Sequence, residues 1–350
     1  MALTLLTLLD PGQPILYTRI FEHLGAVDTI NLLATCRQTM SLKGHVFNVN
    51  VLLRPFFKDP LQFRQVMADN DLVVGGSMAL RFFSREKWES NDIDVYTESH
   101  ESVAIAAAFL QKKGYQYEPY FWQTQNLSET IARRDRVKEM ITEARQSKRV
   151  SDDTIKEEGY LYGIEEIKDI YRFSHPGSNK KIEVVLTRGS VVQLILSYYA
   201  TFLMNFFTYR TAYSLFPSST FRGKNGFYVP PKGRIKEKTM NGILKYHDRG
   251  YSILTNWRED YEYKSCARLR TVGDCNTWSI PLCTRGIDAP SRDIRLQGIS
   301  FIVTPKPSIA ASCYPPLWYS YPFAYYEALE RELRETDRLV IKMGKSRPMF

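Results

Sequence analysis

Apolar residues occur along the chain in two patterns, one typical of strands and one typical of helices. Together the two patterns predict an α+β fold. Short apolar runs rich in β-branched residues have the length of strands. They predict strands near residues 72–74 and at Ile93–Tyr96, Tyr115–Tyr120, Tyr160–Phe173 and Lys181–Leu186. Elsewhere apolar residues repeat at helical spacing. These segments predict helices from Ser77 and at Glu101–Leu110, Asn126–Val150, Ser190–Phe207 and Glu237–Gly250.

The N-terminal segment predicts two short helices joined by a tight turn. Gly25 is placed to end the first helix and Asp28 to cap the second. The segment resembles an F-box, on the evidence of Pro14, Ile20, Phe21, Leu24, Asp28, Leu32, Leu33, Cys36 and Arg37. That resemblance implies docking of residues 14–40 onto the adaptor subunit of a cullin-type ubiquitin ligase. A simpler interpretation is that the helix pair only packs against the rest of the protein.

Residues 72–98 contain the pattern with the most chemical content. A short strand leads to Gly75, Gly76 and Ser77, a helix follows, and Asp92 and Asp94 open the next strand. Glycines after a strand let backbone N–H groups approach phosphate, and the start of the following helix favours an anion. Alternation along a strand places Asp92 and Asp94 on one face. Paired carboxylates with further open positions suit Mg²⁺.

This order of elements resembles the DNA polymerase beta superfamily of nucleotidyltransferases. The resemblance implies a third carboxylate on a later strand, for which Glu183 in the run KKIEVVL is the candidate. Two departures from the family pattern stand out: 14 residues separate Ser77 from Asp92, and glutamate replaces the more usual aspartate. A further resemblance, over most of residues 14–256, is to fungal proteins that join an F-box-like start to a nucleotidyltransferase-like domain.

These resemblances imply an expected function and a site. Asp92, Asp94 and Glu183 are expected to be catalytic and to bind Mg²⁺ or Mn²⁺. Gly75, Gly76, Ser77 and Arg81 are expected to bind a nucleoside triphosphate, whose nucleotide is transferred to a hydroxyl acceptor. The alternative is a ubiquitin-ligase adaptor whose transferase-like domain is inactive and only binds a target. A sugar-nucleotide transferase, a calcium loop and a serine hydrolase have less support, since their spacings or motifs are missing.

Composition sets the remaining expectations. With 350 residues and 44% hydrophobic content, we expect F-box-like helices at 1–65, a nucleotidyltransferase-like mixed sheet flanked by helices at 66–260, and a β-rich then helical extension at 261–350. The net charge of +9 and the basic stretch 222–249 favour a phosphate-bearing partner, nucleic acid included. Five scattered cysteines favour reduced thiols and a cytoplasmic or nuclear protein. No apolar run reaches spanning length without charges, so no membrane association is expected.

Overall fold

The structure is a computed structural model. It describes residues 9–10, 12, 14–132, 166–229, 237–254, 269–288, 296, 299–303 and 309–312.

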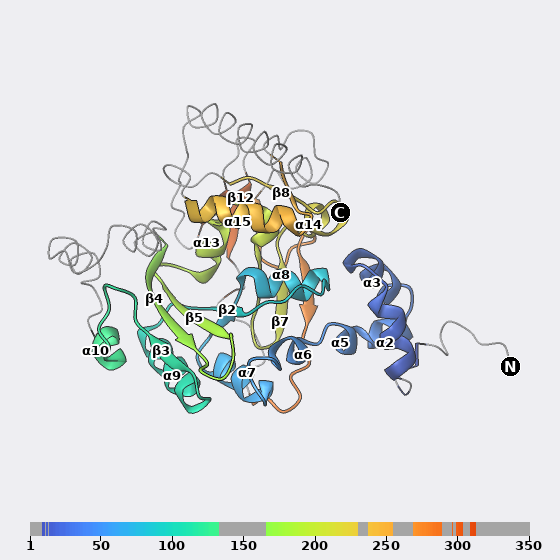
Figure 1. Ribbon diagram of the computed structural model, residues 1–350. Helices are drawn as coiled ribbons and strands as arrows, with labels where there is room; N and C mark the ends of the chain where they lie inside the picture. Colours follow the sequence, from blue (N-terminus) through green and yellow to red (C-terminus); the bar gives the residue numbers. More distant parts are fainter. Residues whose placement is uncertain are drawn as a thin grey trace, which may run out of the picture.

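An eight-stranded mixed sheet forms the centre of the molecule (Figure 1). Its strand order is β11-β7-β6-β1-β2-β5-β4-β3. The strands are β1 (Val73–Val74), β2 (Asp92–Thr97), β3 (Gln116–Glu118), β4 (Ile167–Ser174), β5 (Lys181–Thr187), β6 (Asn205–Phe207), β7 (Thr211–Ser214) and β11 (Trp278–Pro281). The pairing of β2 with β5 is parallel and the other pairings are antiparallel. Helices flank this sheet, so the predicted α+β class is confirmed.

Helices cover both faces of the sheet. On one face, Ile93 and Val184 pack with residues of α6 (Val49–Leu53), α7 (Pro60–Asp69) and α9 (His100–Lys112). On the other face, Tyr96 and Val185 pack with α13 (Val191–Leu196). Figure 1 shows α7 and α9 below the sheet and α13 and α15 (Glu237–Asp248) above it. The two faces therefore have separate hydrophobic cores, as the alternation of side chains along each strand requires.

Local signals in the sequence explain where several helices begin. Ser99 accepts a hydrogen bond from the Ser102 N–H at the start of α9 (3.3 Å). Ser190 caps α13 in the same way through the Gln193 N–H (3.3 Å). At α7, Asp59 accepts from the Leu61 N–H (3.1 Å) and Pro60 takes the first helical position. Side-chain caps thus fix the ends of the helices that support the sheet.

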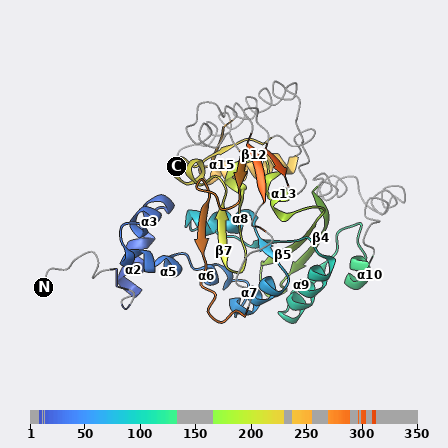
Figure 2. The same cartoon turned by 180° about the vertical axis from the view of Figure 1, so that it is seen from behind.

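The remaining elements lie around this core. They include α8 (Gly76–Ser84), α10 (Leu127–Ala132), the 3₁₀ helix η2 (Thr201–Leu203) and α14 (Pro217–Arg222). Strands β8 (Asn225–Phe227) and β9 (Ser252–Leu254) form a two-stranded sheet, and β10 (Leu269–Thr271), β12 (Ser300–Val303) and β13 (Ile309–Ser312) form a three-stranded one. Figure 2 shows β11 beside β7, so residues predicted to belong to the C-terminal extension complete the central sheet.

The chain between the two predicted strands, His175–Lys180, forms the turn of a β-hairpin. Strand β4 pairs with β5 antiparallel, and the His175 N–H donates to the Lys180 carbonyl (3.0 Å) across the turn. The prediction of one buried helix over Ser190–Phe207 is wrong. Helix α13 ends at Leu196, and after η2 the chain enters the sheet as β6. The Asn205 side-chain amide donates to the Phe202 carbonyl (2.6 Å), which satisfies a buried carbonyl of η2.

Three other predictions, two of helices and one of a strand, fall partly or wholly outside the described residues. Within the predicted helix Asn126–Val150 the structure describes α10 only, and residues 133–150 lie outside the described residues. Strand β4 begins at Ile167, and residues 160–165 of the predicted strand also lie outside them. The C-terminal helix expected after residue 324 is likewise outside the described part of the chain.

The N-terminal segment contains the two predicted short helices and continues into further ones. They are α2 (Pro14–Glu22), α3 (Ala26–Leu33), α4 (Arg37–Ser41) and α5 (Lys43–Val46). The predicted cap of the second helix is wrong: Gly25 is the N-cap of α3, and Asp28 lies in its first turn. Phe21 and Leu33 are buried in the same hydrophobic cluster as Ile93 and Val184 of the sheet. The N-terminal helices therefore share a core with the sheet.

None of the helices within the described ranges is long and apolar enough to cross a membrane.

Candidate functional site

The glycine elbow, Gly75 and Gly76, lies between β1 and α8 and directly beside Asp94. The Gly75 N–H donates to the Asp94 carbonyl (3.2 Å). Gly76 has a φ of +61°, and a Cβ added there would overlap with the Asp94 carboxylate. Only glycine combines that backbone conformation with so close an approach. The elbow thus brings the N-terminus of α8 against a carboxylate of β2.

Ser77 points toward the start of β2. Its Oγ is 3.4 Å from the Ser90 Oγ, and the Ser90 hydroxyl donates to the Asp92 carbonyl (3.2 Å). The structure therefore places Gly75, Gly76 and Ser77 next to Asp92 and Asp94. Arg81, the fourth predicted nucleotide-binding residue, lies on α8, further from the elbow.

Asp94 and Glu183 lie side by side on neighbouring strands. Strand β2 pairs in parallel with β5, and the register sets Asp94 opposite Glu183 and Asp92 opposite Lys181. Residues in register on parallel strands project to the same face of a sheet. Asp92 is exposed, whereas Asp94 and Glu183 are half-buried. Asp94 and Glu183 thus lie on neighbouring strands and project from the same face of the sheet, with Asp94 beside the glycine elbow.

Three carboxylates do not by themselves form a ready metal cage here. Among the residues that the structure describes, no group of three or more His, Cys, Asp or Glu side chains is arranged to hold a metal ion. The Glu183 carboxylate already has two strong donors. Arg172 Nε is 3.1 Å from Glu183 Oε1, and the Tyr120 hydroxyl donates to the same oxygen (2.8 Å). Asp92 and Asp94 remain as the carboxylates suited to a cation.

Tyrosines surround Asp94 on the other side. The hydroxyls of Tyr96 and Tyr198 hydrogen-bond each other. Burial raises the pKa of both phenols, and the negative charge of Asp94 raises each pKa further. The pKa of Tyr246 on α15 is also raised, first by burial; Arg249 opposes that rise and Asp94 adds to it. These phenols therefore remain neutral near the Asp94 carboxylate.

Two arginines converge near α8. Burial lowers the pKa of Arg81, and the positive charge of Arg249 lowers it further. The Arg249 guanidinium lies over two aromatic rings, 4.7 Å from the centroid of Trp88 and 5.2 Å from that of Tyr246. Within the described part of the chain, Arg249 Nη1 is buried and has no hydrogen-bond partner. The two guanidinium groups repel each other and Arg249 retains an unused donor, which favours an anion nearby, although Glu89 also lies close enough to raise the pKa of Arg81.

Sequence reasoning did not identify Arg172, Tyr120 or Arg249 as site residues. A signal for Arg172 exists in the hairpin: counting outward from the turn pairs Ser174 with Lys181, and then Arg172 with Glu183. Arg249 ends the basic stretch 222–249, which the sequence did assign to phosphate contact. Tyr120 reaches Glu183 from outside the hairpin, and no local pattern predicts that contact.

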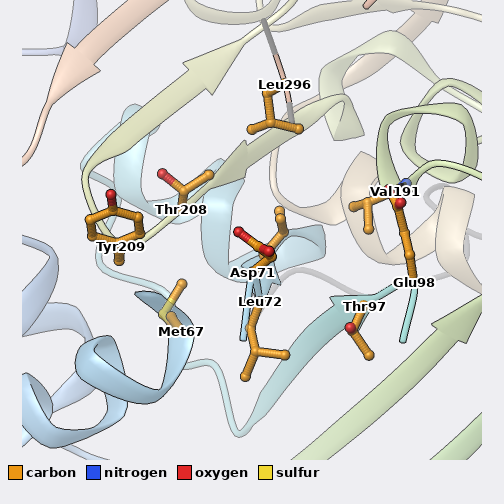
Figure 3. A pocket seen from close by; sticks show the side chains of 10 residues that line it. Met67, Asp71, Leu72, Thr97, Glu98, Val191, Thr208, Tyr209 and Leu296 are labelled. Atoms are coloured by element: carbon orange, nitrogen blue, oxygen red, sulfur yellow. Dashed lines mark hydrogen bonds between the residues drawn. The ribbon is translucent and has the colours of Figure 1, made fainter. Parts of the chain in front are cut away.

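A cavity of about 40 Å³ lies at the other end of β1 and β2 (Figure 3). Asp71, Leu72, Thr97, Glu98 and Val191 contribute to its lining. There the Val191 N–H at the start of α13 donates to Glu98 (3.0 Å). Nucleotide sites have volumes of several hundred Å³, so this cavity is too small for one. It also lies away from the glycine elbow, at the opposite ends of the strands.

Comparison of the chain with models of protein families, with curated proteins and with solved structures gave no match. The function is therefore inferred from the residues of the site alone.

Proposed function

We propose that this protein is a metal-dependent nucleotidyltransferase-like protein, which binds a nucleoside triphosphate and transfers its nucleotide to a hydroxyl acceptor. One observation carries the proposal. The parallel register of β2 and β5 sets Asp94 beside Glu183, and the glycine elbow at Gly76 lies against the Asp94 carboxylate. A fold that brings anion-binding backbone and carboxylates together suits a phosphate ester carried with a cation.

The chain's residues divide the work of holding such a ligand. Asp92 and Asp94 fit Mg²⁺ or Mn²⁺, because both are carboxylates on one face of β2 and Asp92 is exposed. A bound cation would neutralise charge on the phosphates. Backbone N–H groups at Gly76 and Ser77, at the start of α8, would orient the triphosphate. Arg81 and Arg249 would hold its far end through charge-assisted hydrogen bonds.

The proposed transfer balances as a displacement at phosphorus. The acceptor oxygen forms a bond to the α-phosphorus, and the bond from that phosphorus to the bridging oxygen of the β-phosphate breaks. Pyrophosphate leaves, and the proton of the acceptor hydroxyl passes to a site carboxylate or to water. The acceptor can be the end of a nucleic acid, since the stretch 222–249 is basic and contributes Arg249 to the site.

A second candidate function is favoured by the contacts of Glu183. Its Oε1 is held by Arg172 and Tyr120, which suits a domain that recognises a target without transferring a nucleotide. In that case the helices within residues 14–40 would bind the adaptor subunit of a cullin-type ligase. The protein would then link a target to the ligase.

The two candidates differ in a direct experiment. Labelled ATP, GTP, CTP and UTP are each incubated with the protein, Mg²⁺ and RNA, while the melting temperature is followed with and without nucleotide. We expect stabilisation by one or more nucleotides and a labelled product. Asp92→Asn combined with Asp94→Asn should abolish both, whereas Glu101→Gln, an exposed acid on α9, should change neither.

Further outcomes separate the functions. Arg249→Gln should weaken nucleotide binding and leave cation binding unchanged, because Arg249 would contact the phosphates and not the cation. Capture of the ligase adaptor subunit without nucleotide-dependent stabilisation would replace the transferase by the adaptor. Equal stabilisation of wild type and the double Asn variant would remove Asp92 and Asp94 from the site.

A further inference from the structure

Charged side chains form a row across four strands of the sheet. In register, Asp94 of β2 lies opposite Glu183 of β5, Glu183 lies opposite Arg172 of β4, and Arg172 lies opposite Glu118 of β3. All four are half-buried, and they share one face because register partners project together. Across the row the order is therefore acid, acid, base, acid, and the base is Arg172. The base is the immediate neighbour of the third carboxylate of the site.

Three hydrogen bonds link the side chains of Arg172, Tyr120 and Glu183 to one another. Arg172 Nε donates to Glu183 Oε1 (3.1 Å), Arg172 Nη2 donates to the Tyr120 hydroxyl (2.7 Å), and that hydroxyl donates to the same Glu183 oxygen (2.8 Å). The side chains of Arg172 and Glu183 are 26% and 23% exposed. An ion pair so far removed from water keeps its geometry more firmly than a surface pair.

Aromatic packing holds these three hydrogen-bonded side chains in place. The Tyr120 ring stacks on Trp122 with 4.6 Å between centroids and an interplanar angle of 5°. The Arg172 guanidinium carbon lies 4.2 Å from the Tyr120 centroid. Burial lowers the pKa of Arg172, but Tyr120 and Glu183 outweigh it and the net pKa is raised, so the guanidinium stays charged. The positive charge beside Glu183 is therefore permanent.

We propose that the guanidinium of Arg172 takes the place of a second divalent cation beside Glu183, so that the site binds a single divalent cation at Asp92 and Asp94 while Glu183 is held by Arg172 and Tyr120. The proposal rests on the proposed function, because it concerns the same carboxylates. A fixed guanidinium neutralises Glu183 next to Asp94 and removes the need for a second ion there. A cation that reached Glu183 would have to displace both donors at the same oxygen.

Counting bound ions tests the proposal without any activity assay. Mn²⁺ is titrated into the full-length protein and followed by calorimetry. A non-hydrolysable nucleoside triphosphate analogue is present, and its phosphates would share one Mn²⁺ with the protein. Wild type is expected to bind one Mn²⁺ per chain. Arg172→Met should leave Glu183 and Asp94 as adjacent uncompensated carboxylates, and a second Mn²⁺ should then bind. Two ions in wild type, or one ion in folded R172M, would overturn the proposal.

Thermal stability gives a second readout that does not depend on stoichiometry. R172M should melt below wild type without metal, because Glu183 loses its partner. Mn²⁺ should raise the melting temperature of R172M more than that of wild type, since a ligand stabilises in proportion to its binding. Equal Mn²⁺ shifts in the two proteins would contradict the role of Arg172.

Two further variants keep the test decisive. Combining R172M with Glu183→Gln should return the count to one ion and restore stability, because no uncompensated charge is left. If R172M does not fold, Tyr120→Phe keeps the ring stacked on Trp122 and removes only the hydroxyl donor. At excess Mn²⁺ it should show a second, weaker binding event that wild type lacks, and the absence of that event would count against the proposal.

Failure of the inference and failure of the proposed function look different. If wild type binds neither Mn²⁺ nor the analogue, the proposed function fails. If wild type binds both, D94N loses both, and R172M binds as wild type does, then only the role assigned to Arg172 fails.

Discussion

At the scale of single residues, Gly76 has the strictest requirement in the site. Its φ of +61° is in the left-handed region, and the Asp94 carboxylate fills the space where a side chain would begin. The neighbouring Gly75 is also confined, since an added Cβ would lie 2.6 Å from a ring carbon of Tyr96. Gly76, which lets the chain turn from β1 into α8, therefore also sets the position of Asp94.

Gly76→Ala should lower both stability and ligand binding. The left-handed conformation costs a non-glycine residue roughly 1–2 kcal/mol, and overlap with Asp94 adds to that cost. Relief of the overlap must move the carboxylate. We expect the free energy of unfolding to fall by more than about 1 kcal/mol in urea denaturation. Stabilisation by nucleotide and Mg²⁺ should be lost even where the variant is folded.

Gly44 on α5 provides the matched control. A Cβ added there meets nothing within 4 Å, and Gly44 is not among the residues of positive φ. Gly44→Ala should leave stability unchanged or raise it by up to about 1 kcal/mol, because alanine favours helix. Ligand-dependent stabilisation should remain. If both variants behaved alike, the contact between Gly76 and Asp94 would not matter for the site.

At the scale of secondary structure elements, the C-terminal end of α8 connects the N-terminal helices to the sheet. Arg85 follows α8 with a φ of +59° and donates to the carbonyls of Val46 (3.0 Å) and Phe21 (2.7 Å). Its guanidinium also lies 5.7 Å from the Phe47 ring centroid. One side chain thus satisfies carbonyls at the ends of α2 and α5.

Arg85→Ala should loosen those helices selectively. Two carbonyls lose charge-assisted hydrogen bonds, each contributing about 1.5–3 kcal/mol. Hydrogen exchange followed by mass spectrometry should show faster exchange in residues 14–46 and little change in β2 and β5. Arg85→Gly should loosen the same helices but cost about 1 kcal/mol less overall, because glycine relaxes the left-handed backbone. Unchanged protection of 14–46 in both variants would mean that Arg85 does not hold the helices.

The sequence predicts the strands of the site well because their signals are local. Alternation identifies β2 and β5, and the glycine pair identifies the elbow. The helix predicted over Ser190–Phe207 fails because composition alone cannot distinguish a buried strand from a buried helix. Residues 205–207 pair with β1 and β7, a contact with distant segments that overrides the apolar helical pattern. Position in the sheet, not periodicity, decides that segment.

The same distinction applies to the candidate site: contacts between residues close in sequence could be predicted, and contacts between distant segments could not be predicted from local patterns. Asp92, Asp94 and Gly76 lie within one short stretch, and their proximity follows from a strand, a turn and a helix. The pairing of Asp94 with Glu183 joins segments far apart in sequence and was reached through a family resemblance. Tyr120 was missed because its contact with Glu183 depends on how β3 ends beside β4, which no local pattern encodes. Long-range register is the physical information that a single sequence lacks.

At the scale of the whole molecule, Arg270 ties the C-terminal strands to the core. Its side chain is buried and donates to the Leu215 carbonyl (3.1 Å), and it forms a two-point ion pair with Asp274, at 2.5 and 2.9 Å. The guanidinium carbon lies 5.6 Å from the Phe216 centroid and 5.3 Å from that of Phe301. Through Arg270, the three-stranded sheet and the segment between β7 and α14 become one unit.

Asp274→Asn should destabilise the protein in a pH-dependent way. Burial raises the pKa of Asp274, but hydrogen bonds and charge from Arg270 outweigh it, so the net pKa is below the ordinary value of 3.8. A carboxyl with a lowered pKa stabilises the fold above its ordinary pKa, and this is lost as pH falls through the lower value. At about pH 7 the variant should therefore unfold more easily by about 3 kcal/mol, because Arg270 stays buried without its anion. Urea denaturation at about pH 7 and about pH 3 should show the difference between variant and wild type shrinking at the lower pH. A difference that stayed constant would mean that Asp274 contributes through packing and not through its charge.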